Sequence, residues 1–211
     1  MAVYVILPAA GRSRRMGVAK LLIRWGDCLV IEHVLDAVRR HPAVSRVGVL
    51  CRADDRELRQ AVSGCSGVEL VVPAAEPEEM RNSVECLVEA MRDSESPGWM
   101  LIPADHPVIE VDVLDRLIHA WMQQPEKIAV PVHDGQRGHP TIFPASFPEE
   151  IKQIPAGKGI NWLLRSAAPE AVQEVPCPEV SVLFDLDTPE DLARLQRQFK
   201  THNGRQESGG H

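Results

Sequence analysis

The sequence predicts an α/β protein with a Rossmann-like, mostly parallel sheet and helices on both of its faces. One observation is that short apolar runs alternate with longer segments whose apolar residues recur at helical spacing. Such alternation is typical of βαβ units, whose crossover helices cover a parallel sheet. A second observation is that a loop containing glycines and cations directly follows the first apolar run. We expect strands at residues 3–7, 46–50, 68–72, 99–103 and 128–132.

Helices are expected between these strands, where apolar residues repeat at i, i+3, i+4 and i+7. The repeat occurs at residues 31–38, 84–91 and 114–121. After residue 132 the pattern changes, because residues 140–143 look like a strand and prolines divide the region after them into short pieces. A substrate-specific insertion would sit there.

The end of the chain predicts one more helix and then a tail. The helix should begin at Thr188 as N-cap, with Pro189 in the first helical position and Leu192, Leu195 and Phe199 on its buried side. A length of 211 residues suits one domain with one core, which we place at residues 1–199. Residues 200–211 are polar and glycine-rich, so we expect them to be disordered.

Composition indicates a soluble globular protein, with 44% hydrophobic and 25% charged residues and no apolar run that could span a membrane. The chain enters its first strand without a signal peptide, so we expect a cytoplasmic protein. Five scattered cysteines, none in a C-x-x-C pair, argue against a disulfide framework and a structural zinc site. A net charge of −7 disfavours nucleic acid as the main partner.

The loop over residues 7–20 has the composition of a polyphosphate site. Gly11 and Gly17 let the backbone turn and bring N–H groups close to a ligand, while Arg15 and Lys20 supply positive charge. The spacing fits neither the dinucleotide-binding G-x-G-x-x-G nor the P-loop G-x-x-x-x-G-K-[ST], which argues against a dinucleotide-dependent oxidoreductase. The alternative is a solvated surface loop, which the ordered spacing disfavours.

This loop resembles the first motif of the MobA-like nucleotidyltransferases, L-x-A-G-x-[GS]-x-R-M-G-x-x-K. The match falls on Gly11, Ser13, Arg15, Met16, Gly17 and Lys20. The resemblance implies a nucleotide-diphospho-sugar transferase type of fold and is strongest to the molybdenum cofactor cytidylyltransferases. It also implies that Arg15, Lys20 and Asp105 are catalytic and that the nucleotide is bound by Ala9, Ala10, Gly11, Ser13, Arg15, Lys20 and Ser83.

Two carboxylates are candidates to hold Mg²⁺. Asp105 directly follows an apolar strand and is flanked by prolines, which suits a metal ligand but also a turn or capping aspartate. Asp187 lies in a segment that resembles the family's D-[IV]-D-T-P-E-D-L, and the resemblance implies that it is the second ligand. An acidic residue before a helix is favoured by the helix dipole in any case, and Asp185 is the alternative ligand.

The base and sugar of the nucleotide are expected at residues 79–84, which align with the family's G-M-x-x-S segment. Ser83 is the candidate contact, although Asn82 with Glu85 would also make a capping pair. Ala9-Ala10-Gly11 stands where guanine-using relatives have A-G-G. Ala10 is therefore the one ground for favouring CTP over GTP.

The acceptor is expected at Arg137, Gly138 and His139, which match the family's R-G-H-P before a strand. A lone histidine is more often a hydrogen-bonded turn residue. The chain departs from the family at Ala104-Asp105-His106-Pro107, where G-D-Q-P is usual. It departs again at residues 156–161, where Gly157 and Asn161 replace the acidic and arginine positions of G-D-x-G-A-R.

The implied reaction moves CMP from CTP to a phosphorylated acceptor, molybdopterin by resemblance, with release of pyrophosphate. The acceptor phosphate is already anionic, so positioning and charge neutralisation suffice without a general base. A molybdoenzyme or its chaperone would receive the product. The alternatives are a sugar-phosphate or other small-phosphate nucleotidyltransferase and a protein that binds nucleotide without turning it over.

Overall fold

The main sheet has the strand order β10-β7-β9-β6-β1-β4-β5, and β8 pairs with β7. The computed structural model describes residues 2–11, 19–93, 97–104, 106–195 and 197. The four strands at one side, β5, β4, β1 and β6, are mutually parallel, and β7 is parallel to β10. Only β8 and β9 pair antiparallel with their neighbours within the described sheet, so the prediction of a mostly parallel sheet is confirmed. The strands are β1 (Val3–Pro8), β4 (Val44–Leu50), β5 (Val68–Val71), β6 (Gly98–Leu101), β7 (Ile128–His133), β8 (Gln136–Arg137), β9 (Thr141–Phe143) and β10 (Val172–Pro176).

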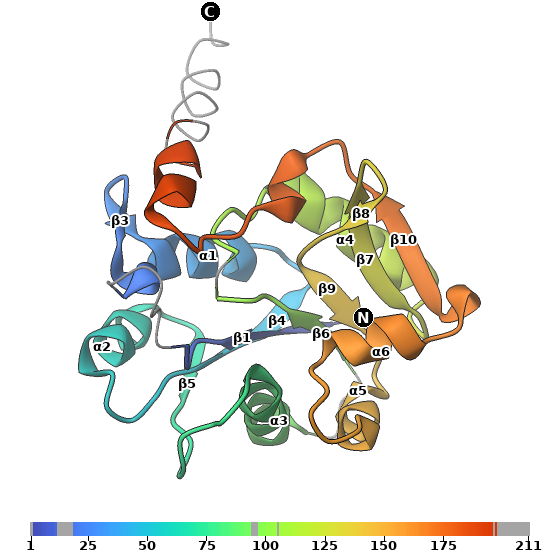
Figure 1. Cartoon of the computed structure of the whole chain (residues 1–211), viewed down its shortest axis with the longest axis horizontal. Helices are drawn as coiled ribbons and strands as arrows, with labels where there is room; N and C mark the ends of the chain where they lie inside the picture. The colour runs from blue at the N-terminus through green and yellow to red at the C-terminus, as the bar shows by residue number, and fades with distance from the viewer. Residues whose placement is uncertain (1, 12–18, 94–96, 105, 196, 198–211) are drawn as a thin grey trace, which may run out of the picture.

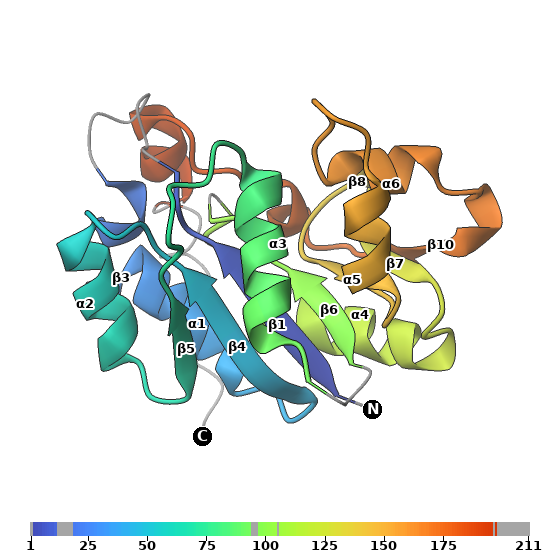
Figure 2. The same ribbon diagram turned by 90° about the horizontal axis from the view of Figure 1, so that it is seen from below.

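Helices cover both faces of the sheet (Figures 1 and 2). One face packs against α1 (Val30–Arg39), α2 (Arg56–Gly64) and α4 (Val111–Gln123). The other packs against α3 (Met80–Met91), α5 (Phe147–Glu150) and α6 (Asn161–Ser166). Side chains of β1 alternate between the two cores because successive residues of a strand point to opposite faces: Val3, Val5 and Leu7 join the first, and Tyr4 and Ile6 join the second.

Several elements lie outside the sequence prediction, and each has a weak apolar pattern. Only two residues of α2, Leu58 and Val62, are buried, and β10 buries Val175 alone. A two-stranded hairpin, β2 (Arg24–Trp25) with β3 (Cys28–Leu29), precedes α1 and is too short to show a period. Short 3-10 helices occur at Lys20–Leu22, Ile151–Gln153, Pro169–Ala171 and Val180–Leu183.

The final helix begins as the sequence predicts, with residues 189–195 helical. The Asp191 N–H donates to the Thr188 hydroxyl oxygen at 3.1 Å, and the Thr188 N–H donates to the Asp191 carboxylate at 3.0 Å, so Thr188 caps the helix. Leu195 is buried and Leu192 is partly buried. Phe199 and the predicted tail at 200–211 lie outside the described residues.

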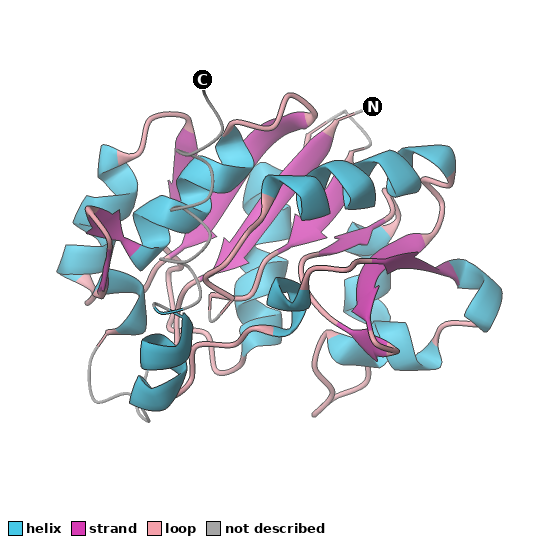
Figure 3. Ribbon diagram, turned by 90° about the horizontal axis from the view of Figure 1, so that it is seen from above, coloured by secondary structure: helices cyan, strands magenta, loops and turns pink. Residues whose placement is uncertain are grey.

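Ligands of open α/β sheets bind beyond the carboxyl ends of the strands, where the chain direction of the connections reverses. Here β1 is the reversal point, because the chain moves outward from it to β4 and β5 and then returns to its other side at β6. Figure 3 shows the loops that follow the carboxyl ends of the strands, where the arrowheads point. Within the described ranges, no helix combines the length and apolar character needed to cross a membrane.

Candidate functional site

The end of β1 supplies the first part of the candidate nucleotide site. Ala9 is buried, and its N–H donates to the Leu50 carbonyl of β4 at 2.9 Å, while Ala10 is half-buried and Gly11 is exposed. Among the described residues other than its chain neighbours, none has an atom within 4 Å of a side chain placed on Gly11. The described part of the chain therefore leaves room for a ligand beside the Gly11 backbone.

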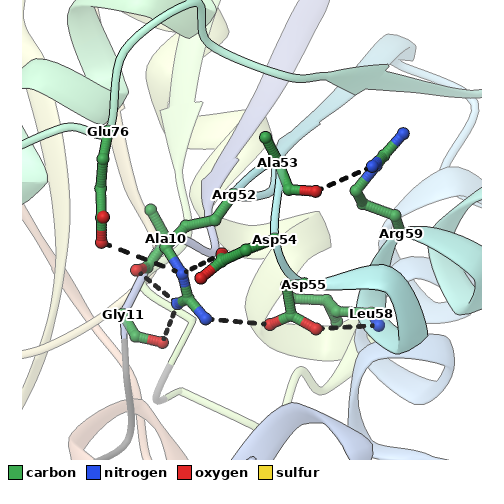
Figure 4. Close-up of polar contacts among 9 residues, drawn as sticks. All are labelled: Ala10, Gly11, Arg52, Ala53, Asp54, Asp55, Leu58, Arg59 and Glu76. Atoms are coloured by element: carbon green, nitrogen blue, oxygen red, sulfur yellow. Dashed lines mark hydrogen bonds and ion pairs between the residues drawn. The ribbon is translucent and has the colours of Figure 1, made fainter.

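Arg52 lies beside this turn, two residues beyond the end of β4 (Figure 4). Its Nη1 donates to the carbonyl oxygens of Ala10 at 2.9 Å and Gly11 at 3.2 Å. Asp54 and Asp55 hold the rest of the guanidinium, and the side chain is 12% exposed. The contact fixes the start of the phosphate loop to the neighbouring strand. Sequence reasoning missed Arg52, although a cation directly after a predicted strand was the available signal.

Lys20 and Asp187, which are 167 residues apart in the sequence, meet at the site. The Lys20 ammonium lies 3.5 Å from Asp187 Oδ1, with side chains 13% and 45% exposed. Lys20 begins a 3-10 helix after the phosphate loop, and Asp187 immediately precedes the Thr188 cap. Leu186 is fully buried between the exposed Asp185 and the half-buried Asp187, which anchors the segment. The structure thus brings together two residues that the sequence assigned to phosphate and metal.

Three other predicted site residues, Ser13, Arg15 and Asp105, lie outside the described residues, and their roles stay predictions. Among the residues that are described, no group of three or more histidine, cysteine, aspartate or glutamate side chains is placed to enclose a metal ion. Mg²⁺ in phosphate-transfer sites is usually held by one or two carboxylates together with substrate phosphates and water. The half-exposed carboxylate of Asp187 could be one such ligand, and the neighbouring Lys20 ammonium could bind the phosphates.

Ser83 lies in the first turn of α3 and is 2% exposed. Glu79 and Asn82 cap the helix, with the Glu79 N–H donating to Asn82 Oδ1 at 3.1 Å. The predicted Asn82–Glu85 contact is also present, because Asn82 Nδ2 donates to Glu85 Oε2 at 3.4 Å. Arg81 joins this helix to the segment that follows the 3-10 helix at Ile151–Gln153. Its Nη1 donates to the Ile154 carbonyl at 2.8 Å, and its Nε donates to Glu85 at 2.8 Å.

The Arg137-Gly138-His139 segment packs against the chain that leads to Asp187. The His139 N–H donates to the Val182 carbonyl at 2.8 Å, and a Cβ on Gly138 would collide with that same oxygen. Arg137 Nε donates to Glu174 at 2.9 Å on β10. These contacts give the motif a structural role, which the sequence suggested for His139 alone, and its role in acceptor binding stays a prediction.

His106 and His139 bring two of the predicted motifs into contact. Their rings meet edge to face with centroids 5.8 Å apart, and His106 is 1% exposed. The peptide between His139 and Pro140 is cis. The A-D-H-P segment after β6 and the R-G-H-P segment before β9 therefore share one packing site at the sheet edge.

Cys51, between Leu50 and Arg52, is fully buried, and burial raises the pKa of its thiol to about 12. Because a protonated thiol is a poor nucleophile, Cys51 is a packing residue at the site. All five cysteines are free thiols.

The chain matches the family model of the MobA-like NTP transferase domain over residues 5–173. The chain belongs to the MobA-like NTP transferase family. This membership confirms the resemblance of the phosphate loop. It also makes the protein a member of a nucleotidyltransferase enzyme family.

Two MobA-like relatives span almost the whole chain. The molybdenum cofactor cytidylyltransferase of Escherichia coli (strain K12) is 20% identical over 198 residues, which are 94% of this chain and 97% of the relative. A molybdenum cofactor guanylyltransferase of Serratia proteamaculans (strain 568) is 24% identical over 196 residues, which are 92% and 93% of the two chains. The nucleotide differs between these two relatives, since one is named a cytidylyltransferase and the other a guanylyltransferase.

Solved structures share the fold of this chain. Rv0371c of Mycobacterium tuberculosis H37Rv is 25% identical, with a TM-score of 0.78 over 93% of this chain and 98% of its own. A second structure of that protein is a complex with manganese, at 24% identity and a TM-score of 0.72 over 93% and 99% of the chains. The 4-diphosphocytidyl-2C-methyl-D-erythritol synthase of Anaerococcus prevotii DSM 20548 is 16% identical, with a TM-score of 0.73 over 94% and 96%.

Proposed function

We propose that this protein is a cytoplasmic cytidylyltransferase that moves CMP from CTP to a phosphorylated acceptor of the molybdopterin class and releases pyrophosphate. The observation that carries the proposal is the ion pair between Lys20 and Asp187, together with the exposed Gly11 that follows β1, in a chain of the MobA-like family. A cation, a carboxylate and accessible backbone at one sheet edge are the parts that a metal-bound triphosphate needs.

CTP is favoured over GTP by Ala10, since the guanine-using pattern has glycine there. The E. coli cytidylyltransferase, which aligns over 97% of its length, supports this choice. The guanylyltransferases that also match make GTP the competing nucleotide.

In the proposed reaction an oxygen of the acceptor phosphate attacks the α-phosphorus of CTP. The bond from the α-phosphorus to the bridging oxygen breaks, and pyrophosphate leaves with its electron pair. Lys20 and Arg15 hold the β- and γ-phosphates and stabilise the charge that develops on the leaving group. Because the acceptor phosphate is anionic at neutral pH, the site needs no side chain that removes a proton.

Asp187 and Asp105 are the proposed ligands of Mg²⁺, with Asp185 as the alternative to Asp187. Bound Mg²⁺ would neutralise phosphate charge and polarise the phosphorus–oxygen bonds. Asp187 suits this role because its carboxylate is half-exposed and already lies beside the cation that we assign to the same triphosphate. The manganese bound to the related mycobacterial protein supports a divalent cation in this family.

A sugar-phosphate or other small-phosphate acceptor is the second candidate, because the acceptor motifs depart from the family. Gly157 stands at the family's acidic position and has φ +72°, a conformation that favours glycine. Asn161 stands at the arginine position and begins α6. Gly157 thus belongs to a turn and Asn161 to the start of a helix. Neither supplies the charged side chain that the family has at that position for its acceptor.

The test is a product assay with Mg²⁺, each of the four nucleoside triphosphates in turn, and molybdopterin or a panel of sugar phosphates as acceptor. The expected result is pyrophosphate release with CTP and molybdopterin together, and an acceptor heavier by one CMP. Transfer to a sugar phosphate in place of molybdopterin would mean that the acceptor is a sugar phosphate. Nucleotide-dependent thermal stabilisation without pyrophosphate would make the protein a binder and overturn the proposal.

A further inference from the structure

We propose that Arg52 is a positioning residue. It orients the start of the phosphate loop, at Ala10 and Gly11, for nucleotide binding and does not itself contact the nucleotide. This inference rests on the proposed function, because it assigns to Arg52 the orientation of the backbone that receives the triphosphate. No motif of the loop includes Arg52, which lies 41 residues beyond Gly11 in the sequence.

The guanidinium joins three segments at the edge of the sheet (Figure 4). Nη1 spans the successive carbonyl oxygens of Ala10 and Gly11, at 2.9 and 3.2 Å. Nε lies 2.9 Å from Asp54 Oδ1 and 4.0 Å from Glu76 Oε1, and Nη2 lies 3.5 Å from Asp55 Oδ2. Asp55 also caps α2 by accepting from the Leu58 N–H at 3.2 Å, so one end of the network is anchored to a helix.

The contact with the Ala10 carbonyl oxygen fixes the orientation of the peptide between Ala10 and Gly11. In a planar trans peptide the N–H points away from the C=O. The Gly11 N–H is therefore directed away from Arg52, and the cation at the oxygen end polarises that peptide further. An outward N–H in a glycine-containing turn is the kind of donor that binds phosphate oxygens.

The surrounding charges explain why Arg52 positions the loop and does not bind phosphate. Three carboxylates, from Asp54, Asp55 and Glu76, face the guanidinium, and its Nη1 is committed to main-chain oxygens. The charge of the guanidinium is thus directed at these carboxylates and main-chain oxygens. Lysine cannot replace the contact, because only the planar fork of arginine serves acceptors on several sides at fixed angles.

The experiment compares Arg52→Met and Arg52→Lys with Arg59→Met in nucleotide binding and turnover. Arg59 is the matched control, because it also donates to a main-chain carbonyl in this region, that of Ala53 at 2.9 Å, but makes no hydrogen bond to the described part of the loop. We expect Arg52→Met to weaken CTP binding, measured as KM and by calorimetry, on the order of tenfold or more. KM for the acceptor should stay unchanged, Arg52→Lys should recover little, and added methylguanidinium should restore part of the affinity.

Thermal unfolding of each variant separates a local effect from loss of the fold. Unchanged CTP affinity in Arg52→Met, or an equal loss in Arg59→Met, would overturn the positioning role. Full activity of Arg52→Lys would mean that positive charge alone is sufficient at this position, and it would also overturn the positioning role. If the wild-type protein itself neither binds nor turns over any nucleoside triphosphate, the proposed function fails first, so the two failures are distinguishable.

Discussion

Lys20 is the described side chain on which nucleotidyl transfer should depend most. Lys20→Ala removes the charge that stabilises the leaving pyrophosphate, so we expect turnover to fall about 10²–10³-fold. The fold should remain, because the Lys20–Asp187 pair is 3.5 Å long and its carboxylate is 45% exposed, and pairs of this kind contribute about 1 kcal/mol or less to stability. Pyrophosphate release and thermal unfolding measure the two effects.

The control for that variant is Lys127→Ala. Lys127 immediately precedes β7, so it lies at the amino ends of the parallel strands, and the candidate site lies at their carboxyl ends. It should release pyrophosphate at the wild-type rate. Near-normal release by Lys20→Ala would remove Lys20 from the catalytic machinery.

Gly138 is a residue where packing requires the absence of a side chain. Gly138→Ala would drive a Cβ into the Val182 carbonyl oxygen, which accepts the His139 N–H at 2.8 Å. We expect the free energy of unfolding to fall by about 1–3 kcal/mol, as for other overpacked sites. Denaturant unfolding measures the loss. Gly159→Ala, where a Cβ meets no protein atom within 4 Å, should be nearly neutral, and equal losses in both variants would contradict the explanation.

Among the elements, the helix at 189–195 matters because its cap immediately follows Asp187. The Thr188 hydroxyl donates to Asp191 at 2.8 Å, and chiefly this hydrogen bond lowers the pKa of the Asp191 carboxyl below its ordinary 3.8. A folded-state pKa that is lowered gives stability that is present above 3.8 and is lost as the pH falls through the lower folded value.

We therefore expect hydrogen exchange of residues 189–195 to accelerate as the pH is lowered past 3.8, after correction for the intrinsic rates. Asp191→Asn keeps the shape of the side chain but removes the titrating group, so its exchange should lack this acid step. An identical acid step in Asp191→Asn would assign the effect to another carboxyl.

The elements also show what the sequence could predict and what it could not. Long periodic helices such as α1, and buried runs such as β1, were predictable because packing on one face or two leaves a repeat in the sequence. α2 and β10 were not, because α2 buries only Leu58 and Val62, and β10 only Val175. Motif spacing pointed to Lys20 and Asp187 separately, but their contact depends on the folded chain. Arg52 and Arg81 act through main-chain carbonyls, which leave no motif.

In the molecule as a whole, the candidate site lies at the carboxyl ends of the parallel strands, and a structural network lies near their amino ends. Arg46, in β4, binds Glu69 through two hydrogen bonds of 2.6 and 2.7 Å and Asp93 at 2.9 Å. Its guanidinium also lies 5.1 Å from the centre of the Tyr4 ring, and the Tyr4 hydroxyl donates to Asp93 at 2.7 Å. The network ties β1, β4 and β5 together away from the phosphate loop.

Arg46→Met should therefore separate stability from catalysis. The change leaves two carboxylates without their cation, and we expect the free energy of unfolding to fall by about 1–3 kcal/mol. KM values for nucleotide and acceptor, measured well below the unfolding temperature, should match the wild type. A changed KM with unchanged stability would mean that this network communicates with the site.

The claim that unites these residues is that bond cleavage occurs between the α- and β-phosphates. Its most direct test is to incubate the protein with Mg²⁺, molybdopterin and CTP labelled at either the α- or the γ-phosphate. Nucleotidyl transfer predicts that the α-label moves to the acceptor and the γ-label leaves as pyrophosphate, and that Lys20→Ala slows both to the same extent. Release of the γ-label as free phosphate, with the α-label kept in CDP, would contradict the central claim.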